Sequence, residues 1–396
     1  MLISFTVANF RSIKDPQTFS FVASSDRSHS STHCLQTGNK AVPRLSKAAV
    51  IFGANGSGKS NFLCALCVMR DMVLHSNRWL DGELADRYQP FLFPQGEAVP
   101  TEFSIDVLIG QTRHQYSFSF NGTRICSERL LVWSTAKAQR WFERCFDESS
   151  NMHAWAPFSP HFKSPVGGTR RPDLRRALFL GIAAQDCAQL RPLMDWFAHG
   201  IRSLGADEPV ERSALIEVVR HAASKRRLLD FLQGGGVRVS DVRISRLPFP
   251  RVEFEHESTN RPLGWIRLDD ESSGTQRLVG LFAPLSAAIE YGHLLLADEF
   301  DNGLHPLVAR HLIRAINDSS DRSRGAQIVM TTQTSTLMDM EILRRDEIWL
   351  MELNDSHMSI LKTITDRASP PRLGEMISTR YLTGHYGAIP QVGVAG

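Results

Sequence analysis

The sequence has no apolar run of the length that a membrane-spanning helix needs, about 18 residues or more. Its opening stretch, MLISFTVANFRSIKD, lacks the basic segment and long apolar stretch of a secretory signal. Cysteine is scarce, with six dispersed residues, as is usual in a reducing compartment. Cys64 and Cys67 form a CxxC pair, but without a second pair they predict no zinc site. We therefore expect a cytoplasmic protein with no membrane segment.

The chain also has little excess charge of either sign. Its 45 Lys and Arg residues nearly balance 42 Asp and Glu residues, for a net charge of +3. This balance permits contact with nucleic acid but does not argue for it. The 396 residues, of which 42% are hydrophobic and 22% charged, are typical of a soluble globular protein with two or three subdomains.

Glycine is concentrated in the stretch VIFGANGSGKSN, residues 50–61. Its core, GANGSGKS, fits the phosphate-binding pattern G-x-x-x-x-G-K-[ST], which is known as Walker A. KAAVIF before it reads as a short strand, and NFLCALCVMRDMVL after it has apolar residues at helical spacing. Such glycines let successive N–H groups point at one anion, and the following helix adds its positive end. We predict that Lys59 reaches the β- and γ-phosphates of a nucleotide and that the Ser60 hydroxyl binds Mg²⁺.

Two acids follow a second apolar strand in HLLLADEF, residues 293–300. We predict that Asp298 holds Mg²⁺ through water and that Glu299 is the general base that orients a water molecule at the γ-phosphate. A helix should open at His305-Pro306, because proline suits the first helical position. A further strand over 327–331 ends in polar residues, which could place Gln333 near the γ-phosphate.

A second anion site is indicated by DDESSGTQRLVGLFAPLSAAI, which lies just ahead of the acidic strand. Hydroxyl groups and a glycine precede an apolar helix there, so a helix N-terminus would again face an anion. One chain seldom needs two phosphate sites for one nucleotide, whereas two copies that face each other do.

These motifs resemble those of ABC-type ATPases of the SMC/RecF-like branch. ESSGTQRL resembles the signature motif, and GANGSGKSN, NFRS and LLLADEFDNGLHP resemble that branch as well. The sequence is most similar to the AAA-domain ABC-type ATPases of bacterial anti-phage and abortive-infection operons, strongly at 1–15, 50–66, 268–310 and 327–339 and weakly at 140–260. The resemblance implies ATP and Mg²⁺ as cofactors. It also implies a head-to-tail homodimer in which one subunit's Walker A loop faces Ser273, Gly274 and Gln276 of the other.

The same resemblance assigns further residues. It places Arg11 and Ser12 near the nucleotide, His305 in the D-loop and Gln89 in the Q-loop as a metal ligand, although a polar residue before proline fits a turn equally well. Relatives usually have TTHN where this chain has TTQT, and glutamine cannot shuttle a proton, so we expect a slow ATPase. The expected nucleotide contacts of the loop are Gly53, Asn55, Gly56, Ser57, Gly58, Lys59, Ser60 and Asn61.

The expected fold is α/β: an ABC-type P-loop NTPase head with a mixed central sheet, an antiparallel β-subdomain and a helical insertion. We assign 1–100 to an N-terminal lobe with Walker A and 101–165 to the β-subdomain, where alternating apolar residues precede an Asn-Gly turn. Residues 166–236 read as a compact helical insertion, too short for coiled-coil arms. Residues 237–396 form the C-terminal lobe with the signature motif, Walker B, D-loop and switch loop.

Three functions fit these motifs. In the first, ATP-driven dimerisation controls a separate effector, such as a nuclease or toxin, in antiviral defence. In the second, a RecF-like DNA-repair ATPase clamps nucleic acid. In the third, which has the least support, the chain is the nucleotide-binding subunit of a transporter. Basic clusters in GTRRPDLRR (168–176) and ASKRRLL (223–229) could touch a phosphodiester backbone, or could form solvated helix faces.

Overall fold

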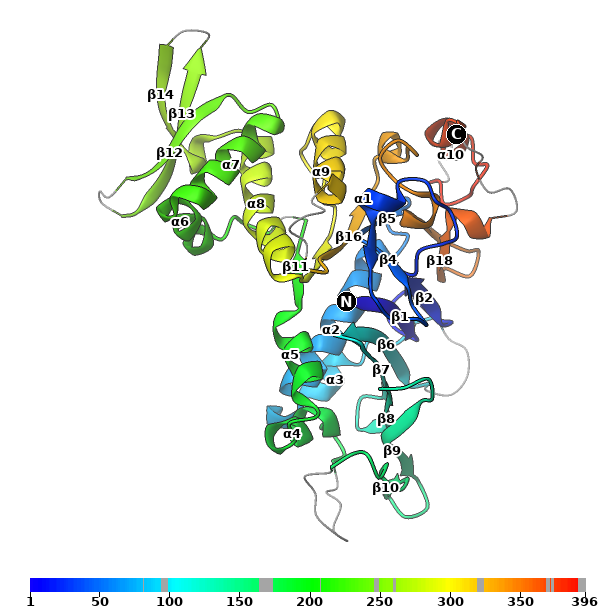
Figure 1. Ribbon diagram of the computed structural model, residues 1–396. Helices are drawn as coiled ribbons and strands as arrows, with labels where there is room; N and C mark the ends of the chain where they lie inside the picture. Colours follow the sequence, from blue (N-terminus) through cyan, green and yellow to red (C-terminus); the bar gives the residue numbers. More distant parts are fainter. Residues whose placement is uncertain are drawn as a thin grey trace.

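The computed structural model contains two large β-sheets, one antiparallel and one mostly parallel, with helices packed around them (Figure 1). It describes residues 1–80, 82–93, 99–163, 174–206, 208–245, 249–258, 261–318, 324–367, 371 and 374–390. No helix within these ranges is both long and apolar enough to cross a membrane. The mixed α/β class expected from the sequence is confirmed.

The six-stranded sheet carries the motifs. Its order is β11 (Ile201–Leu204), β15 (Leu294–Ala297), β16 (Gln327–Thr332), β5 (Ala48–Phe52), β17 (Ile348–Leu353) and β18 (Ser359–Thr363), and only β18 is antiparallel to its neighbour. Side chains of a strand point alternately to the two faces of its sheet. Ala49 and Ile51 of β5 therefore join one core, which we call the first core, whereas Ala48, Val50 and Phe52 join a second core on the opposite face. Burial on both faces explains why AAVIF, the sequence of β5, is a continuous apolar run.

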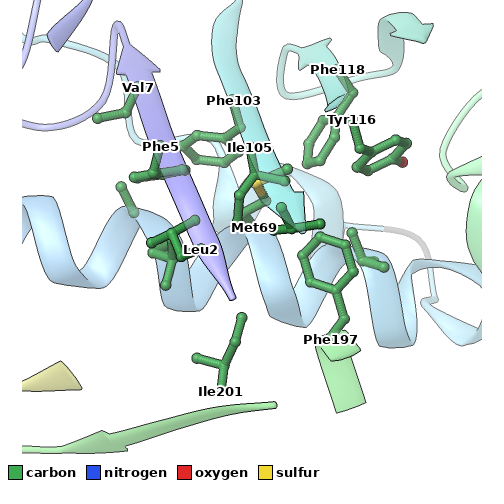
Figure 2. Close-up of a cluster of buried hydrophobic side chains, with 14 of the residues drawn as sticks. Leu2, Phe5, Val7, Met69, Phe103, Ile105, Tyr116, Phe118, Phe197 and Ile201 are labelled. Carbon is green, nitrogen blue, oxygen red and sulfur yellow. The ribbon is translucent and has the colours of Figure 1, made fainter. Parts of the chain in front are cut away.

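The seven-stranded sheet is antiparallel throughout and covers the first core. Its order is β10 (Met152–Trp155), β9 (Gln139–Asp147), β8 (Ile125–Trp133), β7 (Thr112–Phe120), β6 (Thr101–Ile109), β1 (Leu2–Ala8) and β2 (Gln17–Ser20). Figure 2 shows Phe5 of β1 and Phe103 of β6 packed above Met69 of the helix that follows Walker A. The two sheets are tied together by the buried Gln327 side chain, which bonds the backbone N–H and C=O of Leu2 at 2.5 and 2.9 Å.

Helices cover both faces of the six-stranded sheet. Buried side chains of α2 (Lys59–His75), α4 (Phe179–Asp186) and α5 (Arg191–His199) belong to the first core. Those of α6 (Arg212–Arg220), α7 (Ala222–Gly234), α8 (Ser273–Tyr291) and α9 (Pro306–Asp318) belong to the second core. The remaining elements are α1 (Ser30–His33), α3 (Glu83–Arg87), α10 (Ile377–Leu382), the sheet of β12 (Val239–Ser245), β13 (Arg251–Ser258) and β14 (Arg261–Arg267), and the pair β3 (Cys34–Gln36) and β4 (Arg44–Ser46).

The expected insertion at 166–236 is divided between the two cores. Its helices α4 and α5 pack beside α2, whereas α6 and α7 pack beside α8 and β12. Between these pairs, β11 joins the edge of the six-stranded sheet, and sequence analysis did not expect a strand there. The four residues of β11, IRSL, do not alternate between apolar and polar side chains, so no strand period is visible there. Likewise, the strands of 101–165 share a sheet with β1 and β2. The four domain ranges stay a prediction.

A buried ion pair fastens α4 to the antiparallel sheet. Glu128 of β8 and Arg144 of β9 have fully buried side chains that lie 2.7 Å apart. The Glu128 carboxylate also accepts the Tyr116 hydroxyl at 2.9 Å and the backbone N–H groups of Phe179 and Leu180, at 2.8 and 2.9 Å, in the first turn of α4. One carboxylate therefore neutralises an arginine and satisfies a helix N-terminus.

We expect Glu128→Ala to lower the free energy of unfolding by about 3–5 kcal/mol, because the Arg144 charge would stay buried without its partner. Urea denaturation monitored by circular dichroism measures the effect. Glu148→Ala is the matched control, since Glu148 pairs with Arg124 but its side chain is 74% exposed. Exposed pairs contribute only about 0–1 kcal/mol. Equal losses in the two variants would show that the Glu128 network is not a stabilising anchor.

Candidate functional site

The predicted motifs meet at one edge of the six-stranded sheet. Strands β15, β16 and β5 are adjacent and parallel, so their carboxyl ends lie together. Loop 53–58 follows β5, the acids Asp298 and Glu299 follow β15, and Gln333 follows β16. Ligands of parallel α/β sheets bind at this edge. The expected strand, loop and helix around Walker A are present, with β5 ending at Phe52 and α2 beginning at Lys59.

Lys59 is buried inside the Walker A loop. Its ammonium group donates hydrogen bonds to the carbonyl oxygens of Gly53 and Ala54, at 2.8 and 2.9 Å. Burial lowers the pKa of Lys59, and this effect is opposed by the negative charges of the carboxylates that follow β15, with Glu299 foremost and Asp298 next. Lys59 of the Walker A motif and the two acids that follow β15 therefore lie close enough in the folded chain to interact electrostatically.

Gly58 adopts a conformation that other residues rarely reach, with φ +103°. A Cβ at this position would also collide with the Ser359 hydroxyl and come within 2.8 Å of the Ser12 hydroxyl. Both backbone conformation and space therefore require glycine here.

The turn that holds Arg11 and Ser12 lies against the first turn of α2. The Arg11 guanidinium donates to the side-chain oxygens of Gln89 at 2.6 Å and Asn61 at 3.3 Å, and the Asn61 amide donates to the Ser12 hydroxyl at 2.8 Å. The structure thus brings Arg11, Ser12, Gln89 and Asn61 together. The side-chain oxygen of Gln89 accepts a hydrogen bond from Arg11 here, and its role as a metal ligand stays a prediction.

The turn after β15 is fixed by two residues from other elements. The Thr331 hydroxyl donates to the Asp298 carboxylate at 2.6 Å and accepts the backbone N–H of Glu299 at 2.7 Å. Arg277 donates to the backbone carbonyls of Asp298 and Glu299, at 3.2 and 3.1 Å. Glu299 has a positive φ of 42°, a strained value that tends to occur at functional sites. Its carboxylate accepts the Gln333 amide at 2.7 Å, which joins the predicted base to the predicted switch residue.

The predicted D-loop, which follows Glu299, is tied to the predicted switch loop, which follows β16. The Asp301 carboxylate accepts the Thr332 hydroxyl at 2.7 Å and also bonds the Thr334 hydroxyl. His305 is exposed immediately before α9, and its ring nitrogen accepts the backbone N–H of Leu307 at 3.2 Å. Movement of one loop would therefore displace the other through these hydrogen bonds.

The predicted signature motif forms the N-terminus of α8. Ser272 caps this helix, since its hydroxyl accepts a backbone N–H in the first turn. Ser273 is exposed, and Gly274 packs closely on the D-loop, because a Cβ at Gly274 would lie 2.9 Å from the carbonyl oxygen of Gly303. The Gln276 amide donates to the carbonyl oxygen of Glu271 at 2.9 Å, so it holds the loop before the helix.

The Walker A helix and the signature helix lie on opposite faces of the six-stranded sheet. Buried side chains of α2 join the first core, whereas those of α8 join the second core. Figure 1 shows α2 running toward α4 and α5, while α8 lies beside α7 and the β12–β14 sheet. The two predicted anion sites thus belong to different parts of the subunit.

Three residues that organise this site were not predicted from the sequence: Arg277, Thr331 and Ser359. Arg277 follows the signature motif directly, and Thr331 ends an apolar strand with a hydroxyl, so each had a local signal. Ser359 lies about 300 positions after the loop that it contacts, and nothing in the nearby sequence indicates that contact.

Comparisons with known proteins agree with this architecture. Residues 48–339 match the model of the family described as "AAA domain, putative AbiEii toxin, Type IV TA system". No curated protein matches the chain. Among solved structures, the chain resembles an SMC head crystallised in complex with the C-winged helix domain of ScpA. The TM-score is 0.50, and the identity is 15% over 91% of this chain and 97% of that one. The chain also matches the SMC head domain from Thermotoga maritima, with a TM-score of 0.41 and 15% identity over 91% of this chain and 98% of that one. The likeness to the ScpA-bound head shows that the chain has the fold of an SMC head, as expected from the sequence.

Proposed function

We propose, since the chain belongs to the AAA-domain family whose model its residues 48–339 match, that it binds ATP with Mg²⁺ and hydrolyses it. The observation that carries this proposal is the placement of the Walker A loop, with its buried Lys59, and of the acids Asp298 and Glu299 at the same carboxyl edge of the parallel sheet. A lysine inside a glycine loop suits phosphates, and carboxylates at this edge suit a metal ion and a nucleophilic water.

The donor set fits Mg²⁺. An exposed Ser60 hydroxyl at the start of α2 and a half-buried Asp298 carboxylate offer the hard oxygen atoms that this ion prefers. Mg²⁺ would neutralise phosphate charge, while Lys59 would bind the phosphates. Glu299 would hold and deprotonate the attacking water, and Gln333 would orient Glu299 through the hydrogen bond between them. An amide cannot carry the proton onward, which is why we propose a slow ATPase.

We further propose that two copies enclose ATP head to tail. The signature helix lies on the opposite face of the sheet from the Walker A helix, and Ser273 at its start is exposed. Next to the D-loop, the apolar side chain of Leu307 is 68% exposed, as suits a residue that a partner covers. A second subunit would bring Ser273, Gly274 and Gln276 to the phosphates bound by the first.

The cellular role that we propose is control of a separate effector in antiviral defence. The description of the family names a toxin of a toxin–antitoxin system, which supports a place for this chain in a system of that kind. The alternative is a RecF-like ATPase that clamps DNA during repair. Copurification with the products of the adjacent genes distinguishes them: a nuclease or toxin supports defence, whereas a repair protein supports the alternative.

The second basic cluster favours the first of these roles. Lys225, Arg226 and Arg227 pair with Asp241, Asp230 and Glu290 at 2.6, 3.1 and 3.4 Å, so their charges are partly neutralised within the chain. In the first cluster, Arg170 and Arg171 lie outside the described residues. Arg175 donates to the backbone carbonyl of Asn151 at 2.8 Å.

The direct test of the proposed site is Lys59→Ala. Loss of charge-assisted hydrogen bonds to the phosphates should weaken Mg·ATP binding by roughly 100-fold or more, measured by isothermal titration calorimetry. Lys137→Ala, at an exposed lysine between β8 and β9, should bind ATP as the unmodified protein does. Unchanged affinity in the folded Lys59→Ala protein would exclude the Walker A loop as the nucleotide site.

A further inference from the structure

We propose that Ser359 of β18 is a positioning residue for the Walker A loop. Its hydroxyl joins a chain of hydrogen bonds that orients one peptide group of the loop toward the phosphates. The chain links Asn61, Ser12, Ser359 and Ser57, of which Ser12 and Ser359 lie far from the loop in sequence. This inference rests on the proposed ATP-binding function and assigns a role in phosphate affinity to a residue outside all the sequence motifs.

The direction of the chain follows from the donors available. The carbonyl oxygen of Ser57 can only accept, so the Ser359 hydroxyl, 2.8 Å away, donates to it. The Ser359 hydroxyl is also the donor toward the Ser12 hydroxyl at 2.7 Å, so its single proton is shared between the Ser57 carbonyl oxygen and Ser12. Ser12 also accepts from the Asn61 amide at 2.8 Å. Ser359 and Ser12 thus connect the loop to Asn61 through one continuous chain of hydrogen bonds, and such chains strengthen their members by mutual polarisation.

The chain determines where an N–H group of the loop points. In a trans peptide, the carbonyl oxygen of one residue and the N–H of the next point in opposite directions. The Ser57 carbonyl is held against Ser359, on the side of the sheet, so the N–H of Gly58 points away from Ser359. Gly58 directly precedes Lys59, and in a glycine loop of this pattern the N–H groups face the bound phosphates.

Ser359 is well placed to hold this orientation without movement. Ser359 is only 1% exposed. Its backbone N–H donates to the carbonyl oxygen of Ser12 at 2.7 Å, which adds a second hydrogen bond to the turn that holds Ser12. It opens strand β18, where it pairs with Leu353 of β17, and β17 is the direct neighbour of β5. The hydroxyl is therefore fixed by the same sheet that carries the Walker A loop. The absence of a Cβ at Gly58 leaves room for it.

The test compares Ser359→Ala with the matched control Ser356→Ala, which removes an exposed hydroxyl from the same β17–β18 hairpin. For Ser359→Ala, we expect the Kd for Mg·ATP and the KM to rise about 10-fold, as for loss of one buried hydrogen bond within a network, while kcat at saturation stays within about threefold. The Kd of inorganic tripolyphosphate should rise by a similar factor, because the affected N–H group faces phosphate. Ser356→Ala should match the unmodified protein in each measurement.

A second variant tests the chain itself. Ser12→Ala should raise the Kd for Mg·ATP. The Kd of the double variant Ser12→Ala/Ser359→Ala should be only slightly higher than that of the single variant with the higher Kd, because both changes interrupt one chain. Independent, multiplicative losses would overturn the proposal. So would a loss in Ser359→Ala that disappears once the unfolded fraction is subtracted. If the unmodified protein did not bind ATP, the proposed function would fail, whereas equal affinity of unmodified and Ser359→Ala proteins would reject only this inference.

Discussion

Glu299→Gln is expected to slow ATP hydrolysis by about 100- to 10,000-fold, the range that loss of a general base produces. The amide keeps the shape of the carboxylate and can still bond Gln333, but it cannot take a proton from water. Because Lys59 and the loop are untouched, ATP affinity should stay within about threefold. The protein should therefore remain ATP-bound, and the proposed homodimer should accumulate.

Phosphate release under steady-state conditions measures the rate, and light scattering after size-exclusion chromatography measures the mass with and without ATP. Glu341→Gln is the matched control, because the Glu341 side chain is 75% exposed and its contacts to Arg310 and Arg314 are long, at 3.5 and 3.7 Å. If Glu299→Gln hydrolysed ATP at the normal rate, Glu299 would not be the general base. The proposal that the chain binds ATP would still stand.

Ser273→Arg should have the second-largest effect. The long cationic side chain would fill the space at the start of α8 where the partner's nucleotide is proposed to bind, so the ATP-dependent dimer should not form. A single chain should still bind ATP, since Ser273 lies on the opposite face of the sheet from α2. With half of each site missing, we expect turnover to fall by roughly 100-fold or more, comparable to the loss of a preorganised anion-binding group.

Ser213→Arg provides the control for added charge and bulk at an exposed serine near a helix start, because Ser213 lies in the first turn of α6. It should dimerise and hydrolyse ATP like the unmodified protein. Sedimentation velocity with Mg·ATP reports the dimer, and turnover measured over a range of protein concentrations reports its need for a partner. Full turnover by Ser273→Arg, or a specific rate that does not fall on dilution, would refute the two-subunit site.

Much of this molecule follows from local sequence signals. The apolar run before GANGSGKS is long enough to be a strand and is buried on both faces as β5, and the spacing of apolar residues after it predicts α2. Proline at 306 marks a helix start, and α9 does begin there. Such features are visible because glycine, proline and capping residues act on their immediate neighbours in the chain. The hydroxyl groups and glycine that were expected to precede the signature helix, apart from Ser272, instead form its first turn, because α8 begins at Ser273.

Tertiary contacts decided the rest. The four residues of β11 become a strand only because β15 offers them an edge. Arg277 fixes the Glu299 turn and Ser359 holds the Walker A loop because folding brings distant segments together. By itself, the sequence determined which chemical groups the chain can present to a nucleotide, since phosphate-binding loops and paired acids are local patterns. The tertiary structure alone decided how those groups are oriented and that α2 and α8, which begin at the two predicted anion sites, lie on opposite faces of the sheet, since both depend on packing between residues hundreds of positions apart.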